Sequence, residues 1–328
     1  MEMLLCIFEY IITMNTPFSL NKKPYSKHIK LFKGAAFISL NKKRQQEMSS
    51  TSSISQKVIA FDLDETLGYF SDLYILWYSI SKHIYQNDFY DDYDVFKYML
   101  DFYPEFLRYG ILNILGYLYH KKLSGECSHI YLYTNNQCFG KENPKWISLI
   151  TRYFEEKVNT QPNIPLFDHM ICAFKINNQI IEPMRTTQTK TYNDFIRCTL
   201  LPKTTEICFI DNTQYNKMKN DRVYYIQPKS YYHSLYVYEI IDRFASKWIQ
   251  TPLTNEFMNT LQSNLLANQS TKEISMENSQ INLIVSQKIM YYLKEFFLLS
   301  TKPKVHKTKK ISLGIGHFTR KNRNLSVG

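Results

Sequence analysis

Three acidic side chains follow a short run of strand-forming residues near position 60. The stretch reads VIAFDLDETLGYF, residues 58–70, and its acids are Asp62, Asp64 and Glu65. Because side chains alternate along an extended strand, Asp62 and Asp64 are expected to project from one side while Leu63 turns into the core. Two carboxylates at the end of a buried strand are typical of nucleophilic and acid–base chemistry.

Polar residues also follow two other apolar runs. HIYLY is followed by Thr134, Asn135 and Asn136, and EICFI is followed by Asp211 and Asn212. In an open α/β sheet the carboxyl ends of the parallel strands meet at one edge, where ligands bind. The sequence therefore predicts that these side chains lie close to Asp62 and Asp64.

An ammonium group completes the set, because Lys190 stands where a helix leading into a later strand begins. Such a set suits phosphoryl transfer: one carboxylate attacks phosphorus, and a second acid protonates the leaving oxygen. Each carboxylate repels a phosphate dianion by roughly 4 kcal/mol per unit-charge pair at about 4 Å and an effective dielectric of about 20. Mg²⁺ would reverse that sign and prefers the oxygen ligands of Asp and Asn, so we expect it as the cofactor.

The elements that must position these residues alternate between strands and helices. Apolar runs predict strands at 57–62, 129–134, 169–175, 206–211 and 222–226, with an Asn-Asn hairpin after the third. Helical periodicity predicts helices at 71–86, 105–123, 146–158, 191–200, 234–250 and 281–299. Between the first two helices lies an aromatic and acidic segment, 89–104. This alternation predicts an α/β fold with a mainly parallel central sheet flanked by helices.

Domain boundaries follow from the same patterns. We expect a basic extension at 1–47 that contributes little to the fold, and a catalytic domain at 48–252 with a helical insertion at about 70–125. C-terminal helices with a polar linker at 262–281 fill 253–300, and a basic tail follows at 301–328.

Most of the positive charge lies in the two tails. The net charge is +11, yet residues 302–328 carry eight Lys and Arg without any acid, and residues 1–47 carry eight against three Glu. The tails could contact nucleic acid or an acidic partner, or simply be solvated; the charge alone leaves both interpretations open.

Several classes of protein are disfavoured. The six cysteines show no C-x-x-C pair and are expected to be reduced thiols in a cytoplasmic or nuclear protein. A phosphate-binding loop of the G-x-x-x-x-G-K-[ST] type is absent. The apolar start MEMLLCIFEYIITM is too short to span a bilayer, so no transmembrane segment is expected.

The motif DLDET followed by Leu resembles the first motif, D-x-D-x-[TV], of the haloacid dehalogenase (HAD) superfamily. An apolar strand ending in Thr, a lysine and a strand ending in Asp-Asn follow in the superfamily's order, across residues 57–228. The pair DLDETL and D-N is most similar to the branch of small CTD-phosphatase and NLI-interacting-factor-like proteins. The resemblance implies a Rossmann-like HAD fold and a phosphatase that forms an aspartyl-phosphate.

The resemblance also implies residue roles. Asp62 would be the nucleophile, Asp64 the general acid and base, and Thr134 and Lys190 would hold the phosphate. Mg²⁺ would be bound by Asp62, the backbone carbonyl of Asp64, and the pair Asp211 and Asn212. Further candidates for substrate or phosphate contacts are Thr66, Asn135 and Arg185.

Two departures from the branch bear on the substrate. The stretch between the first two motifs, 67–133, is long and helical, so it could form a cap over the site, and the second motif reads T-N-N. The leading hypothesis is a Mg²⁺-dependent phosphatase for phosphoserine or phosphothreonine in proteins. The alternatives are a phosphatase for nucleotides or nucleic-acid ends, and a HAD-fold interaction protein with negligible turnover.

Overall fold

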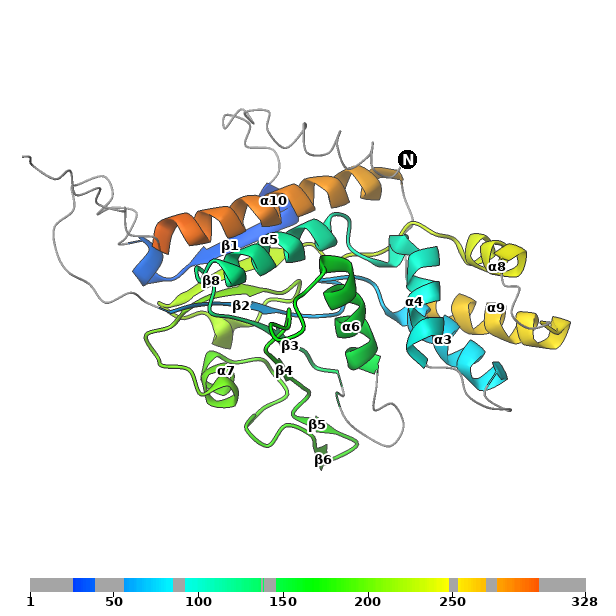
Figure 1. Cartoon of the computed structure of the whole chain (residues 1–328), viewed down its shortest axis with the longest axis horizontal. Coiled ribbons are helices and arrows are strands. Elements are labelled where there is room, and N and C mark those ends of the chain that lie inside the picture. The colour runs from blue at the N-terminus through cyan, green and yellow to red at the C-terminus, as the bar shows by residue number, and fades with distance from the viewer. Residues whose placement is uncertain are drawn as a thin grey trace, which may run out of the picture.

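The central element of the structure is a six-stranded sheet. The computed structural model describes residues 26–38, 56–84, 92–136, 138, 146–247, 253–269 and 276–300. The strand order is β1-β8-β7-β2-β3-β4; β2, β3, β4, β7 and β8 are parallel, and the edge strand β1 is antiparallel to β8 (Figure 1). The strands are β1 (Ile29–Lys33), β2 (Lys57–Phe61), β3 (His129–Tyr133), β4 (His169–Ile171), β7 (Glu206–Ile210) and β8 (Val223–Pro228).

Helices cover both faces of this sheet. The described helices are α3 (Ser71–Ile84), α4 (Asp92–Phe102), α5 (Ile111–Leu123), α6 (Trp146–Val158), α7 (Tyr192–Thr199), α8 (Val237–Lys247), α9 (Asn255–Gln269) and α10 (Met276–Ser300). In β2, Ile59 and Phe61 join a core with α5, α6 and α10, whereas Val58 and Ala60 join a second core with α7. Figure 1 shows α5 and α10 along one face and α7 on the other. The predicted α/β fold with a mainly parallel, helix-flanked sheet is therefore confirmed.

The order of the strands reverses at β2. Phe61 at the end of β2 pairs with Leu132 of β3 on one side and with Ile210 of β7 on the other. Since β3 and β7 leave β2 in opposite directions across the sheet, the carboxyl end of β2 lies at a topological switch point. The residues that follow β2, β3 and β7 are those that the sequence predicts to form the site.

The insertion between β2 and β3 is helical, and it contacts the C-terminal helices. The chain runs through α3, α4, the 3-10 helix η2 (Pro104–Phe106) and α5. Helix α3 packs on α4 and α9, and α9 packs on α8. Figure 1 places these four helices together at one end of the sheet, while α5 lies on its face.

Most of the aromatic and acidic segment, for which no element was predicted, forms helix α4. Tyr93, Phe96 and Leu100 are buried within it at helical spacing. The acids that obscured this pattern in the sequence lie among these positions, so the periodicity of the buried residues, rather than the overall polarity, decides the structure.

The expectation that residues 1–47 contribute little to the fold is wrong for residues 26–38. After the 3-10 helix η1 (Ser26–His28), β1 pairs along its whole length with β8. Phe37 is fully buried, and Lys33 forms an ion pair of 2.7 Å with Glu295 of α10. The open edge of β8 provides a partner for this strand that local sequence cannot reveal.

The predicted polar linker at 262–281 is also partly wrong. Helix α9 continues to Gln269 and α10 begins at Met276. Leu261 and Leu265 are buried on α9, which explains why a segment rich in Asn, Gln and Ser remains helical there. Residues 270–275 lie outside the described part of the chain.

The remaining predictions concern short elements. The Asn-Asn hairpin is confirmed as β5 (Lys175–Ile176) and β6 (Gln179–Ile180), with φ of 48° at Asn177 and 64° at Asn178. Strand β4 ends at Ile171 rather than at residue 175. The 3-10 helix η3 (Asn216–Met218) lies between β7 and β8.

Among the described helices, none combines the length and apolar character needed to cross a bilayer; the apolar start and the tail at 301–328 lie outside the described residues.

Candidate active site

The first acidic residue extends the pairing of the sheet by one position. The backbone N–H of Asp62 donates to the carbonyl of Ile210 at 2.9 Å, so Asp62 leaves β2 beside the end of β7. Leu63 is fully buried in the core, as predicted, and the side chain of Asp62 is turned to the opposite side. Asp62 is 8% exposed, whereas Asp64 is partly exposed.

Lys190 joins the ends of β2 and β7. Its Nζ donates to Asp62 Oδ1 and, at 2.8 Å, to Asp211 Oδ2. Lys190 and Asp211 are each 1% exposed. Burial alone would lower the pKa of Lys190, but the charges of Asp62 and Asp211 outweigh it and raise the pKa, so the ammonium is protonated at neutral pH.

Local sequence explains the position of Lys190 at the start of α7. Thr191 is the N-cap of α7, and its side chain accepts a hydrogen bond from the N–H of Asp194. Lys190 therefore precedes the cap directly, and the helix begins at Tyr192 rather than at the lysine itself. We call Asp62, Lys190 and Asp211 the carboxylate side of the site.

Thr66 connects the turn after β2 with the residues that follow β7. Its Oγ1 lies 3.0 Å from Asp62 Oδ2 and 2.9 Å from Asn212 Oδ1, and it accepts a hydrogen bond from the N–H of Asn212 at 3.1 Å. The side-chain amide of Asn212 donates to Glu65 Oε2 at 3.1 Å. Each oxygen of Asp62 thus has a polar partner, Lys190 on Oδ1 and Thr66 on Oδ2.

A buried arginine from the insertion fixes the turn after the two aspartates. Glu65 has φ of 57°, a left-handed conformation that is costly for a residue other than glycine. Arg108, which is 1% exposed, donates to the carbonyl of Glu65 at 2.6 Å, to that of Thr66 at 2.5 Å and to that of Lys229 at 2.9 Å. These hydrogen bonds stabilise the strained turn at Glu65, so this part of the insertion supports the backbone that follows Asp62 and Asp64.

Asp64 lies next to the second motif. Burial, reinforced by the charge of Asp62, raises the pKa of Asp64 to about 6, and a hydrogen bond from Asn136 opposes the shift. That bond runs from Asn136 Nδ2 to Asp64 Oδ2. A carboxyl group with a pKa near 6 can both release and accept a proton near neutral pH.

The residues after β3 form the amide side of the site, which we define as Asn135 and Asn136 with their supports. Asn135 Nδ2 donates to the hydroxyl of Tyr215 at 3.2 Å. Thr134 is 1% exposed, and its Oγ1 accepts a hydrogen bond from the N–H of Asn136 at 3.0 Å. Among the described residues, Thr134 makes no direct contact with the carboxylate side; it is connected to it through Asn136 and Asp64.

Arg185 lies behind the amide side. Its guanidinium donates to Thr134 O at 3.1 Å, Cys172 O at 2.6 Å, Asn135 Oδ1 at 2.9 Å and Gln188 O at 2.8 Å. The residue is 1% exposed. The sequence predicts a contact with substrate phosphate; in the structure these donors are directed at the protein's own loops.

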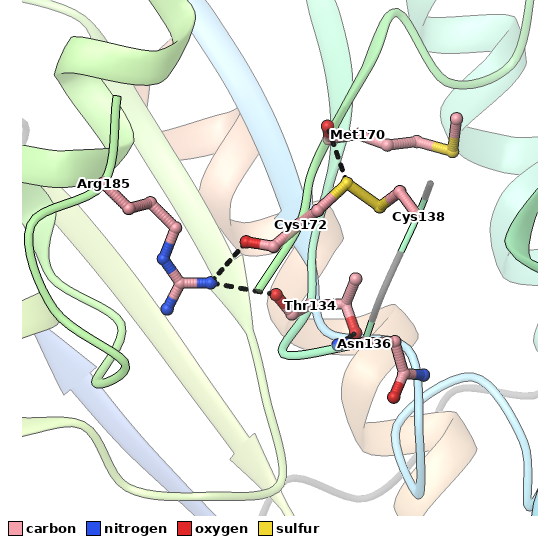
Figure 2. The surroundings of a disulfide bond; sticks show 6 residues. All are labelled: Thr134, Asn136, Cys138, Met170, Cys172 and Arg185. Carbon is pink, nitrogen blue, oxygen red and sulfur yellow. Dashed lines mark hydrogen bonds between the residues drawn. A yellow bond between two sulfur atoms is a disulfide. The ribbon is translucent and has the colours of Figure 1, made fainter. Parts of the chain in front are cut away.

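A disulfide between Cys138 and Cys172 closes the same region, as Figure 2 shows. The expectation that all cysteines are reduced thiols is therefore wrong for this pair. Each cysteine follows one of two adjacent parallel strands, β3 and β4, and this brings their Cα atoms to 5.6 Å, a usual distance for a disulfide. Cys127, Cys198 and Cys208 are free thiols.

The donor set fits Mg²⁺ in its chemistry. Asp62, Asp64, Asp211 and Asn212 supply carboxylate and amide oxygens, which this ion prefers. Burial also raises the pKa of Asp211, as it does that of Asp64, because the ionised forms of both carboxyl groups are poorly solvated there. Within the described residues, however, no three His, Cys, Asp or Glu side chains are already arranged as a metal site.

Sequence reasoning identified the carboxylate side and placed Asn136 near Asp64 without giving it a role, but it missed Arg108, Tyr215 and the disulfide as parts of the site. For Asn136 a signal was present, because it belongs to the T-N-N stretch that follows β3. The cysteines carried a signal too, since Cys138 comes shortly after the predicted strand 129–134 and Cys172 lies within the predicted strand 169–175.

In comparisons with known proteins, no family model, no curated protein and no solved structure matches the chain.

Proposed function

We propose that this protein is a Mg²⁺-dependent phosphomonoester hydrolase that works through an aspartyl-phosphate. The observation that supports this function best is the setting of Asp62. Its two carboxylate oxygens are held by Lys190 and Thr66, and Asp64, with a pKa raised to about 6, stands two residues away. A nucleophile, a proton donor and a fixed positive charge are thereby adjacent.

In the first step, an oxygen of Asp62 attacks the phosphorus, and the bond between phosphorus and the ester oxygen breaks. Asp64 gives its proton to the departing oxygen, so the alcohol leaves neutral. Lys190 places its ammonium beside the oxygens of the transferred group and stabilises the charge that they gain.

In the second step, water attacks the phosphorus of the aspartyl-phosphate. Asp64, now ionised, takes a proton from that water, and the bond to the Asp62 oxygen breaks. Inorganic phosphate leaves and both carboxyl groups return to their starting states. Asp64 thus serves as acid in one step and as base in the next.

The residues that would hold the metal are Asp62, the Asp64 carbonyl, Asp211 and Asn212. When bound, Mg²⁺ supplies the charge that offsets the repulsion between these carboxylates and a phosphate dianion.

The proposed substrates are phosphoserine and phosphothreonine in proteins, a choice supported by the resemblance of DLDETL and the Asp-Asn pair to the small CTD-phosphatase branch. The basic tails make nucleotides or nucleic-acid ends the alternative. Deleting residues 302–328 separates the two: hydrolysis of phosphopeptides should be nearly unchanged, whereas a steep loss on 5′- or 3′-phosphorylated oligonucleotides would favour the alternative.

The test of the function itself is phosphate release from phosphopeptides, nucleotides and sugar phosphates, with Mg²⁺ and with excess chelator. We expect Mg²⁺-dependent release that disappears in Asp62→Asn. If the folded wild type releases no more phosphate than Asp62→Asn from any of these esters, the proposal is wrong and an interaction protein with a surviving pocket becomes the better interpretation.

A further inference from the structure

Asn136 makes the direct contact between the second motif and the proton donor. Its Nδ2 donates to Asp64 Oδ2, across 72 positions of sequence. Its own backbone is fixed on both sides of the Cα atom: the N–H donates to Thr134 Oγ1 at 3.0 Å, and the carbonyl accepts from the N–H of Ala173 at 3.0 Å. The direction of its side chain therefore depends on where the loop after β3 lies relative to the end of β4.

Two connections, which we call ties, set the position of the loop after β3 relative to the end of β4. The disulfide joins Cys138, two residues after Asn136, to Cys172, one residue before Ala173. Arg185 donates both to the carbonyl of Thr134 and to that of Cys172, so it bridges the same two segments (Figure 2). Both cysteines are at most 2% exposed.

The other described cysteines make no comparable connection. Cys127 and Cys208 are buried and Cys198 is partly exposed, and burial raises the pKa of all three thiols. None of them is bonded to another cysteine. Among the described cysteines, the Cys138–Cys172 pair is therefore the one that a reductant would change.

We propose that Asn136 is a positioning residue for Asp64 and that the Cys138–Cys172 disulfide holds it there, so that reducing this bond slows proton transfer to the leaving group. The inference rests on the proposed function, because it assigns Asp64 the part of proton donor. A dithiol breaks the sulfur–sulfur bond, Cys138 and Cys172 each gain one electron and one proton, and the dithiol becomes a disulfide. Arg185 remains as the second tie, so reduction lowers the rate without abolishing it.

The kinetic test compares two aryl phosphates with the oxidised and the reduced protein. Phenyl phosphate has a poor leaving group that needs a proton, whereas p-nitrophenyl phosphate has a good one that hardly does. We expect reduction to lower kcat/KM, which reports the first step alone, about tenfold for phenyl phosphate and by less than about threefold for p-nitrophenyl phosphate. A purely structural loosening would lower both rates by the same factor, and that result would overturn the assignment of Asn136.

Variants identify the residues involved. The double variant Cys138→Ser/Cys172→Ser should match the reduced wild type even where the reductant cannot reach the buried bond. In Asn136→Ala, phenyl phosphate hydrolysis should already be slow and reductant should change it little. Cys198→Ser is the matched control and should respond to reductant as the wild type does. An undiminished response to reductant in Asn136→Ala contradicts the proposed connection.

A readout without turnover separates this inference from the proposed function. Hydrogen exchange of the amides of Asn136 and Ala173 should become faster on reduction, while that of β7 stays constant. If the wild type hydrolyses no ester but shows this change in exchange, the proposed function is wrong, whereas the structural role of the disulfide is confirmed. Unchanged exchange and an unchanged kcat/KM for phenyl phosphate in the reduced protein, or free thiols at both cysteines before any reductant is added, would overturn the inference.

Discussion

The two sides of the candidate site are held together in different ways. On the carboxylate side, Asp62, Lys190 and Asp211 are almost inaccessible to solvent and contact one another directly through charged groups. On the amide side, Asn135 and Asn136 are supported by Arg185, by main-chain hydrogen bonds and by a disulfide. On the carboxylate side the charged groups hold one another directly, whereas on the amide side the two asparagines are held by bonds to neighbouring loops.

This difference predicts different responses to substitution. Removing a charge from the carboxylate side takes away a reacting group or leaves an uncompensated buried charge, and both effects are large. Removing a tie from the amide side changes how well a residue is oriented, so we expect smaller effects that fall mainly on kcat.

The largest effect is expected for Asp62→Asn. An amide is not a nucleophile toward phosphorus, so steady-state phosphate release should fall by about three orders of magnitude or more. Glu65→Gln is the matched control: it removes a neighbouring carboxylate that contacts Asn212 and Tyr232, and the rate should stay within about threefold. Equal losses in the two variants would mean that general negative charge, rather than Asp62, carries the reaction.

A somewhat smaller effect is expected for Lys190→Met. Without the ammonium, Asp62 and Asp211 are left buried beside each other, which should lower the free energy of unfolding by about 3 kcal/mol at pH 7 and kcat by about two orders of magnitude. Urea unfolding and phosphate release measure the two losses. Lys190→Arg keeps the charge and should recover most of the stability; if it does not, packing rather than charge explains the loss.

The carboxylate side could be predicted from the sequence for a physical reason. Asp62, Asp211 and Asn212 follow apolar runs that can be identified locally, and the carboxyl ends of parallel strands meet at one edge whatever their order. Lys190 was placed correctly for a similar reason, because the capped start of α7 is a local pattern.

The supports of the amide side and the hydrogen bond from Asn136 to Asp64 could not be predicted, because they depend on which distant segments are neighbours. Pairing Cys138 with Cys172 requires that β3 and β4 be adjacent, and the partner of Asn136 lies 72 residues away. Arg108 stands between η2 and α5 without any periodic pattern, yet its three acceptors lie in two separate loops. The edge strand β1 was missed on the same ground, since its only local signal is a short run of five residues.

Two buried arginines allow the two sides to be compared directly. Arg108→Lys and Arg185→Lys each keep the charge but lose the planar fork that serves several carbonyl groups. We expect kcat to fall about tenfold for Arg108→Lys, because the strained turn at Glu65 loosens beside the proposed nucleophile, and only a few-fold for Arg185→Lys, since the disulfide remains.

The Michaelis constant distinguishes support from substrate contact in the same pair. With Arg185 directed at protein carbonyls, KM should be nearly unchanged in Arg185→Lys. An increase in KM of tenfold or more at constant kcat would restore the sequence-based prediction that Arg185 contacts the substrate phosphate.

The smallest expected effect concerns Asp64, which lies between the two sides, bonded to Asn136 and close to the charge of Asp62. Its pKa is raised from 3.8 to about 6, so the folded protein binds more protons than the unfolded chain between these values, and the free energy of unfolding falls as pH rises through them. In protein free of divalent cations, Asp64→Asn should reduce this fall by about 1–2 kcal/mol between pH 4 and pH 6.5, as measured by urea unfolding. Asn136→Ala should steepen it instead, because the lost hydrogen bond favours the ionised carboxylate. The same slope in the wild type and both variants would mean that neither burial nor Asn136 controls the proton on Asp64.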